Sequence, residues 1–155
     1  MPKNLQGELV VKSDAAIAIV VSRFNDYLTE HMLRNAVNTF ERLGGNPDQL
    51  TIAHVPGSFE LPVTARKLAE TGKHHAVICL GVVIRGETAH YDHVCEQTAK
   101  GIREVGTQTG VPCIFGVITT ETLEQAINRV GAKAGNHGEK MMLAAIEMAN
   151  LMKKI

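Results

Sequence analysis

The stretch with the most chemical potential is residues 81–94, GVVIRGETAHYDHV. An apolar run ends at Ile84, a turn follows at Gly86, and a helix that carries His90 is predicted after Thr88, which suits the N-cap position. A junction from strand to helix gathers free backbone N–H groups and the positive end of a helix dipole. We therefore predict an anion-binding site here, with His90 placed for proton transfer because an imidazole titrates near neutral pH.

Other interpretations of this stretch remain open. His90 and His93 are three residues apart, which is a spacing that could hold a metal, although no third ligand has motif spacing. The turn Gly86-Glu87-Thr88 could be an ordinary helix cap, and Glu87 would repel an anion unless its carboxylate points away. Neither a phosphate loop of the NTPase type nor a dinucleotide fingerprint is present, which argues against a nucleoside triphosphate.

Further candidates follow other apolar runs. Phe24 and Phe59 are two of only four phenylalanines, and each stands where a polar residue is expected. They could pack against the helices that follow them, or stack on a flat ligand ring. Arg129 could be a surface arginine or could hold a phosphate. Together these residues predict a site for a flat ring and an anion, and they leave the reaction open.

The elements that must position these residues alternate along the chain. Strands are predicted at 16–22, 50–55, 75–84 and 113–118, and helices at 26–43, 62–70, 89–105, 122–130 and 136–152, with a break at 131–135. Capping-box spacing is seen at Thr122 and at Asn136. The residues expected to face inward on the short helix are Leu123, Ala126, Ile127 and Val130. Alternation with short connections predicts a single domain with a parallel sheet covered by helices on both faces.

One segment lies outside this pattern. Gly7–Val11 is a strand candidate with no local partner, and it could add to the sheet edge of another subunit. Sites in parallel sheets lie beyond the carboxyl ends of the strands, where the candidates above fall.

Composition excludes several classes of function. Basic and acidic residues both number 16, which argues against nucleic acid as a partner. The three cysteines, Cys79, Cys95 and Cys113, lack paired metal spacing and fit a reducing, cytoplasmic setting. No apolar run approaches the ~20 residues of a membrane span, and the N-terminal residues lack the apolar region of a signal peptide.

Five blocks of the sequence resemble the lumazine synthase family: VSRFN, PGSFELP, GVVIRGETAHYDHV, GVPCIFGVITTETLEQAINRVG and KAGNHGEK. The resemblance implies one α/β domain over residues 1–155, with a three-layer, flavodoxin-like sheet of four parallel strands and an N-terminal strand that pairs with a neighbouring subunit. It also implies condensation of 5-amino-6-(D-ribitylamino)uracil with L-3,4-dihydroxy-2-butanone 4-phosphate, in which phosphate and water leave. This is the penultimate step of riboflavin biosynthesis, and it needs no cofactor or metal.

Carried over by position, the resemblance gives His90 the proton transfers and places Phe24 on the pyrimidine ring. The residues that would bind the uracil and ribityl groups are Ser58, Phe59, Glu60, Val82, Val83 and Ile84. Glu87 and Thr88 would meet the phosphate through backbone N–H groups. Phe115 and Arg129 would come from the adjacent subunit, and Arg129 would hold the phosphate. Asn25 and His137 would lie near the substrate.

The resemblance also bears on assembly. A site between subunits makes a pentamer the minimal active unit, and the short segment Gly131–Gly138 favours stacking of pentamers into an icosahedral shell, with riboflavin synthase as a candidate cargo. One departure is His137, where family members commonly carry a lysine. Competing functions are a non-catalytic shell or carrier protein that binds lumazine or flavin, and a flavodoxin-like electron carrier. A pure binder has no need to keep both His90 and Arg129.

Overall fold

The computed structural model describes residues 1–132 and 136–155. Within them lies a parallel sheet in the spatial order β2-β1-β3-β4. Its strands are β1 (Ile17–Ser22), β2 (Leu50–Val55), β3 (Ala76–Ile84) and β4 (Cys113–Thr120). The predicted parallel α/β fold is confirmed, and each strand begins and ends within two residues of its predicted bounds.

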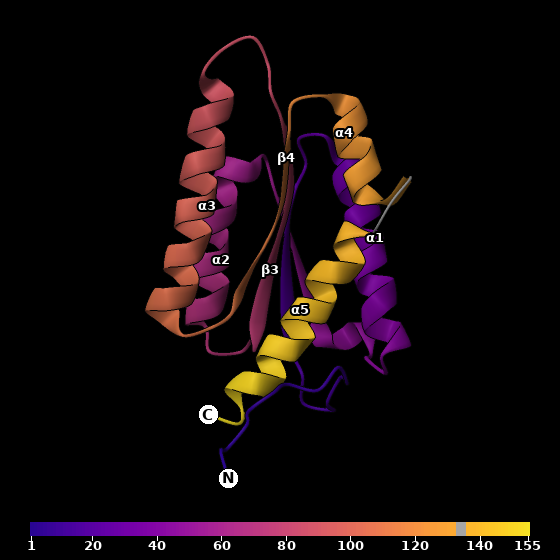
Figure 1. The fold of residues 1–155 in the computed structure, drawn as a ribbon, viewed down its shortest axis with the longest axis vertical. Coiled ribbons are helices and arrows are strands. Elements are labelled where there is room, and N and C mark those ends of the chain that lie inside the picture. The colour runs from indigo at the N-terminus through magenta and orange to yellow at the C-terminus, as the bar shows by residue number, and fades with distance from the viewer. Residues whose placement is uncertain (133–135) are drawn as a thin grey trace.

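Helices cover both faces of this sheet (Figure 1). On one face lie α2 (Leu61–Glu70) and α3 (His90–Thr109), and on the other lie α1 (Asp26–Arg42), the short α4 (Leu123–Ile127) and α5 (His137–Met152). Alternate side chains of β1 enter the two cores: Ile17 and Ile19 pack towards α1 and α5, whereas Ala18 and Val20 pack towards α2 and α3. Because both faces are covered, every residue of β1 is buried, and the strand is a continuous apolar run in the sequence.

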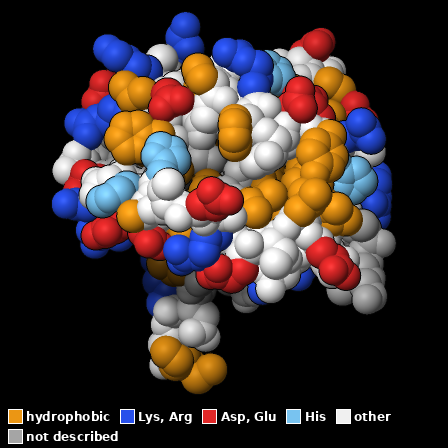
Figure 2. Space-filling model, turned by 90° about the horizontal axis from the view of Figure 1, so that it is seen from above, with side chains coloured by type: hydrophobic (Ala, Val, Ile, Leu, Met, Phe, Trp, Pro, Cys, Tyr) orange, Lys and Arg blue, Asp and Glu red, His pale blue; other side chains and the backbone are white. Residues whose placement is uncertain are grey.

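The strand order creates a switch point between β1 and β3. The chain leaves β1 for β2 on one side, then crosses to β3 on the other, so the two connections diverge at the carboxyl ends of these strands. These ends lie at the top of Figure 1, below the β3–α3 loop. Seen from above in Figure 2, this end of the molecule presents hydrophobic side chains beside histidines. No helix in the described ranges is long and apolar enough to cross a membrane.

The segment Gly7–Val11 forms no strand in the described chain. It lies on the C-terminal half of α5, where the Asn150 side-chain amide donates to the carbonyl oxygens of Glu8 and Val10 at 2.7 and 2.9 Å. A Cβ on Gly7 would lie 1.9 Å from the Glu147 carbonyl oxygen. A strand needs a partner edge, and the sheet of its own chain does not supply one, so pairing with a neighbour stays a prediction.

One prediction at a helix start is wrong. Thr88 is not the N-cap of α3, because the helix begins at His90 and Ala89 takes the cap position without a side-chain bond. Thr88 instead accepts a hydrogen bond from the His90 backbone N–H at 3.3 Å. Asn25 is the N-cap of α1, in the left-handed region at φ 62°, but its side chain does not bond to the helix.

The C-terminal third gives a mixed result. The capping box at Thr122 is confirmed, and the Asn136 side chain accepts from the Glu139 N–H. Leu123, predicted to face inward, is 47% exposed because α4 lies at the rim of the sheet. The last helix ends at Met152 as predicted, whereas α3 continues to Thr109, beyond its predicted end. In the predicted break at 131–135, residues 133–135 lie outside the described residues.

Candidate active site

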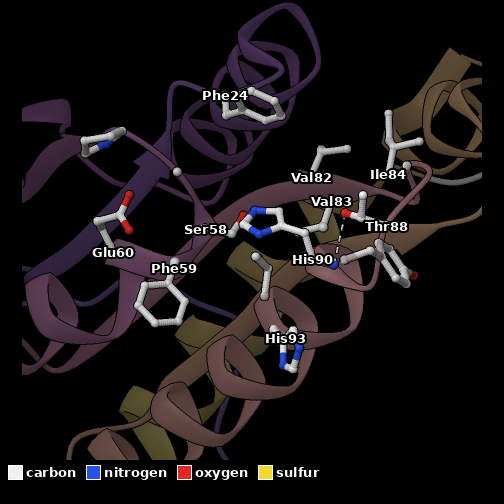
Figure 3. A pocket seen from close by; sticks show the side chains of 15 residues that line it. Phe24, Ser58, Phe59, Glu60, Val82, Val83, Ile84, Thr88, His90 and His93 are labelled. Carbon is white, nitrogen blue, oxygen red and sulfur yellow. Dashed lines mark hydrogen bonds between the residues drawn. The ribbon is translucent and has the colours of Figure 1, made fainter.

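A cavity of about 680 Å³ opens beyond the carboxyl ends of β1, β2 and β3 (Figure 3). Its volume suits one small organic ligand. The structure brings most of the sequence-predicted residues together in its wall, namely Phe24, Ser58, Phe59, Glu60, Val82, Val83, Ile84, Thr88 and His90. Three strand exits that are distant in the sequence therefore meet at one place.

Phe24 is held at the cavity by hydrogen bonds on both sides. Its backbone N–H donates to the Pro56 carbonyl oxygen at 3.0 Å, which joins the exits of β1 and β2. The side-chain amide of the next residue, Asn25, donates to the Val82 carbonyl oxygen at 3.0 Å and joins this turn to β3. The Phe24 ring itself is 71% exposed. Most of the ring is therefore uncovered by the helices, and its face is available to a ligand.

The β2 exit forms a short 3-10 helix, Ser58–Glu60. Phe59 is 58% exposed, whereas Ser58 is 5% exposed and faces β3, where a Cβ on Gly81 would lie 2.4 Å from the Ser58 hydroxyl oxygen. The Ser58 carbonyl oxygen accepts from the Thr98 hydroxyl of α3 at 3.3 Å. The Ser58 hydroxyl has no hydrogen-bond partner among the residues that the structure describes. Buried polar groups favour a partner. Because this oxygen is buried on the side of Gly81, it can pair with a ligand only if the Ser58 side chain turns towards the cavity.

The β3 exit supplies a histidine that is suited to proton transfer. His90 is the first residue of α3, and its exposed imidazole points into the cavity (Figure 3). The first turn of α3 presents backbone N–H groups and the positive end of the helix dipole beside it, which favours a bound anion. Gly86 and Thr88 line the cavity, whereas Glu87 is exposed and does not. Its carboxylate therefore does not form part of the cavity wall.

A second, smaller cavity of about 290 Å³ lies at the exit of β4. Its wall is polar and includes Thr119, Glu121 and Arg129, while Tyr91 lines both cavities. Phe115, which is 43% exposed on β4, lines neither cavity. The single chain thus does not bring Arg129 or Phe115 into the wall that contains His90.

Arg85 lies between the two cavities. Its guanidinium donates to the Asp92 carboxylate at 3.1 Å, pairs with Glu121 at 2.7 Å, and stacks 4.4 Å above the centre of the Tyr91 ring. The hydrogen bond to Asp92, and to a lesser degree the charge of both carboxylates, raises the pKa of the Arg85 guanidinium. The arginine therefore keeps its charge and connects α3 to the exit of β4.

His137 lies outside both cavities, at the start of α5. Burial lowers the pKa of its imidazole below the ordinary value of 6.5, and the positive charges of Lys140 and Arg129 lower it further, against a hydrogen bond with the Gly116 backbone. The imidazole is consequently neutral at pH 7. At this position the chain carries no fixed positive charge.

Some wall residues were not among the predicted site residues. His93 and Val94 follow His90 by three and four residues and share its face of α3, which helical periodicity could have indicated. Tyr91 points to the neighbouring face, and no pattern in the sequence distinguishes it. Within the described ranges, no group of three or more His, Cys, Asp or Glu side chains is arranged to hold a metal ion.

A comparison with family models places the chain. The model described as 6,7-dimethyl-8-ribityllumazine synthase matches residues 14–153, which is nearly the whole chain of 155 residues. The match confirms the resemblance seen in the sequence blocks and agrees with the flavodoxin-like sheet. The family consists of transferase-type biosynthetic enzymes of riboflavin formation, which act on small molecules. The chain therefore belongs to the 6,7-dimethyl-8-ribityllumazine synthase family.

Proposed function

We propose that the protein condenses 5-amino-6-(D-ribitylamino)uracil with L-3,4-dihydroxy-2-butanone 4-phosphate and releases 6,7-dimethyl-8-ribityllumazine, phosphate and water. The observation that carries this proposal is a single cavity that joins an exposed aromatic ring, a partnerless buried hydroxyl and a histidine at the start of a long helix. These groups match the three parts of the reaction, which are a flat pyrimidine, its polar edge and a phosphorylated ketone.

The pyrimidine lies against Phe24 in this proposal. The ring of Phe24 is exposed and its backbone is fixed by two neighbouring strand exits, so stacking costs little ordering entropy. The Ser58 hydroxyl binds a polar atom at the ring edge. The remaining wall residues proposed to contact the uracil and ribityl groups are Phe59, Glu60, Val82, Val83 and Ile84.

His90 moves the protons in this proposal. The pyrimidine amine attacks the ketone carbon, and water leaves as the Schiff base forms. A proton then leaves the adjacent carbon while the C–O bond to phosphate breaks, which gives an enol. The enol takes up a proton on carbon and becomes a ketone, the ribityl-bearing amine attacks that carbonyl carbon, and loss of a second water completes the lumazine. Each step needs a group that accepts or donates a proton near neutral pH, and a positioned histidine suits this role.

In this proposal the phosphate binds at the turn between β3 and α3, beside the first turn of that helix. The backbone N–H groups of Glu87 and Thr88 and the helix dipole favour it there. Arg129 is proposed to complete the phosphate site from a neighbouring subunit, together with the Phe115 ring, because neither side chain lines the cavity of its own chain. Asn25 and His137 are proposed to lie near the substrate without touching the reacting atoms.

A shared site makes a homo-oligomer, with a pentamer as its minimal unit, part of the proposal. The proposed N-terminal strand exchange is supported by Leu9 and Val10, whose side chains are 49% and 51% exposed on a segment that lacks a sheet partner. The icosahedral shell, a riboflavin synthase cargo and the cytoplasmic location rest on the resemblance and the composition.

The direct test mixes the two substrates with purified protein and follows the visible absorbance and fluorescence of the product. We expect the wild type to form the lumazine and His90→Ala to lose about 100-fold in kcat, since positioned proton transfer contributes 10²–10⁴-fold. His54→Ala is the matched control, because it removes an exposed histidine that contacts Glu30 away from the cavity. Binding of lumazine or flavin with no turnover would support the carrier alternative, and equal rates for wild type and His90→Ala would remove His90 from its role.

A further inference from the structure

We propose that Arg85 is a positioning residue, which fixes the first turn of α3 and thereby His90 against the exit of β4. The inference deepens the proposed function, on which its kinetic readout rests. It is carried by four contacts that one residue makes to α3, to β4 and to the turn that follows β4.

The start of α3 has few other supports. Ala89 is the cap residue and offers no side-chain hydrogen bond, and residues 85–90 are all exposed. Across this turn, Thr88 accepts from the His90 N–H, and Ala89 accepts from the Asp92 N–H. These bonds are local to the turn, so they do not fix its position relative to the sheet.

Arg85 supplies that connection. Its backbone N–H donates to the Thr120 carbonyl oxygen at 2.9 Å, which is a further bond between the β3 and β4 chains beyond the end of β3. Its guanidinium then reaches forward to Asp92 and across to Glu121. Asp92 lies in the first turn of α3, and Glu121 directly follows β4. One planar guanidinium therefore connects the start of α3 to the exit of β4.

The Tyr91 ring completes the arrangement. It stacks under the guanidinium at 4.4 Å and lines both cavities, so it forms a wall between them. Tyr91 and Asp92 directly follow His90, and fixing these two residues restricts the backbone from which the imidazole projects. A lysine cannot reproduce this arrangement, because an ammonium lacks the planar fork and stacks poorly on a ring.

The test compares Arg85→Ala and Arg85→Lys with Arg66→Ala. Arg66 is the matched control, since it also forms ion-pair and amide contacts at a partly exposed surface, with Glu70 and Gln108, but lies outside both cavities. We expect Arg85→Ala to lower kcat about ten-fold with the KM of the pyrimidine nearly unchanged, because a small displacement of a reacting group costs rate more than binding. Arg85→Lys should recover only part of the rate, and Arg66→Ala should keep the wild-type kcat.

A second measurement does not depend on turnover. Amide hydrogen exchange over residues 86–93, without substrate, should become faster in Arg85→Ala and stay unchanged in Arg66→Ala. If the wild type forms no lumazine, the proposed function fails while the exchange data still decide the role of Arg85. Unchanged exchange in Arg85→Ala, or full activity in Arg85→Lys, would overturn the inference. If Arg85→Ala does not fold, Glu121→Gln removes one contact alone, and the same exchange change is expected from it.

Discussion

The two cavities described above differ in what they can bind. The larger one, at the exits of β1, β2 and β3, has aromatic and aliphatic walls, one partnerless hydroxyl and His90. The smaller one, at the exit of β4, has hydroxyl, carboxylate and amide groups and Arg129. The larger cavity is therefore suited to a flat ring. The smaller cavity offers the positive charge of Arg129 in a mostly polar wall.

The difference supports the proposed division between subunits. In the proposed reaction a phosphorylated ketone beside His90 needs charge neutralisation, yet the Arg129 of the same chain faces the other cavity. If copies of the chain are arranged in a ring, the Arg129 surface of one copy can face the larger cavity of the next. The comparison therefore predicts that ring recognition is a property of one chain and that phosphate binding requires two.

The strongest test of this division is complementation between two impaired variants. His90→Ala and Arg129→Ala should each lose about 100-fold in activity, since one removes proton transfer and the other a phosphate charge. Mixed oligomers of the two, reassembled together, should regain a fraction of the activity, because some interfaces contain both native groups. The lumazine absorbance measures this recovery.

Two controls accompany that experiment. Sedimentation should show that the wild type and each variant form pentamers or assemblies of pentamers, and a monomeric wild type with full activity would contradict the shared site. If the mixture shows only the summed activity of the two variants although sedimentation shows mixed oligomers, both groups act within one chain.

A smaller effect is expected at the ring wall. Phe24→Ala should weaken binding of the pyrimidine about ten-fold, because an aromatic pair contributes up to ~1.5 kcal/mol beyond its buried area. Tyr27→Ala is the matched control, since Tyr27 is a similarly exposed aromatic side chain outside the cavity. Calorimetric titration with the pyrimidine alone measures the affinity. Equal losses in both variants would show that general surface effects, and not stacking, are responsible.

The smallest effect concerns His137. Because burial lowers its pKa below 6.5 in the folded chain, the unfolded chain takes up the proton first as the pH falls. Folding stability should therefore be fully present above about pH 6.5 and decline as the pH falls towards the folded-state pKa. Urea unfolding from about pH 7 to about pH 5 should show a weaker decline in His137→Gln than in the wild type. Part of the decline should remain, because burial also lowers the pKa of His74. Equal pH dependence in both proteins would contradict this assignment.

The exchange of His137 for the family's lysine tests the same position kinetically. His137→Lys should retain turnover and change the apparent substrate affinity from neutral to alkaline pH, where the imidazole is neutral and the lysine is still charged. A loss of turnover at every pH would show that the position is structurally required.

Much of the fold could be predicted because its strands are buried on both faces. β1 and β3 are continuous apolar runs for that reason, and their bounds followed from the sequence. The short α4 was less predictable, since Leu123 fits the helical period but lies at the rim. The N-terminal segment Gly7–Val11 could not be predicted from its residue pattern alone. Such a pattern is compatible with a strand, but it contains no information on whether a neighbouring strand is available for pairing.

The sequence by itself determined which residues stand at the strand exits, since parallel strands bring their carboxyl ends to one edge of the sheet. It thereby identified most of the wall around His90. Only the tertiary structure decided that the exits of β1, β2 and β3 form one cavity while Arg129 faces another, and that Arg85 joins α3 to β4. The physical reason is that periodicity records which side of an element is buried. Contacts such as those of Asn25 with Val82, or of Arg85 with Glu121, join residues far apart in the sequence and leave no periodic pattern.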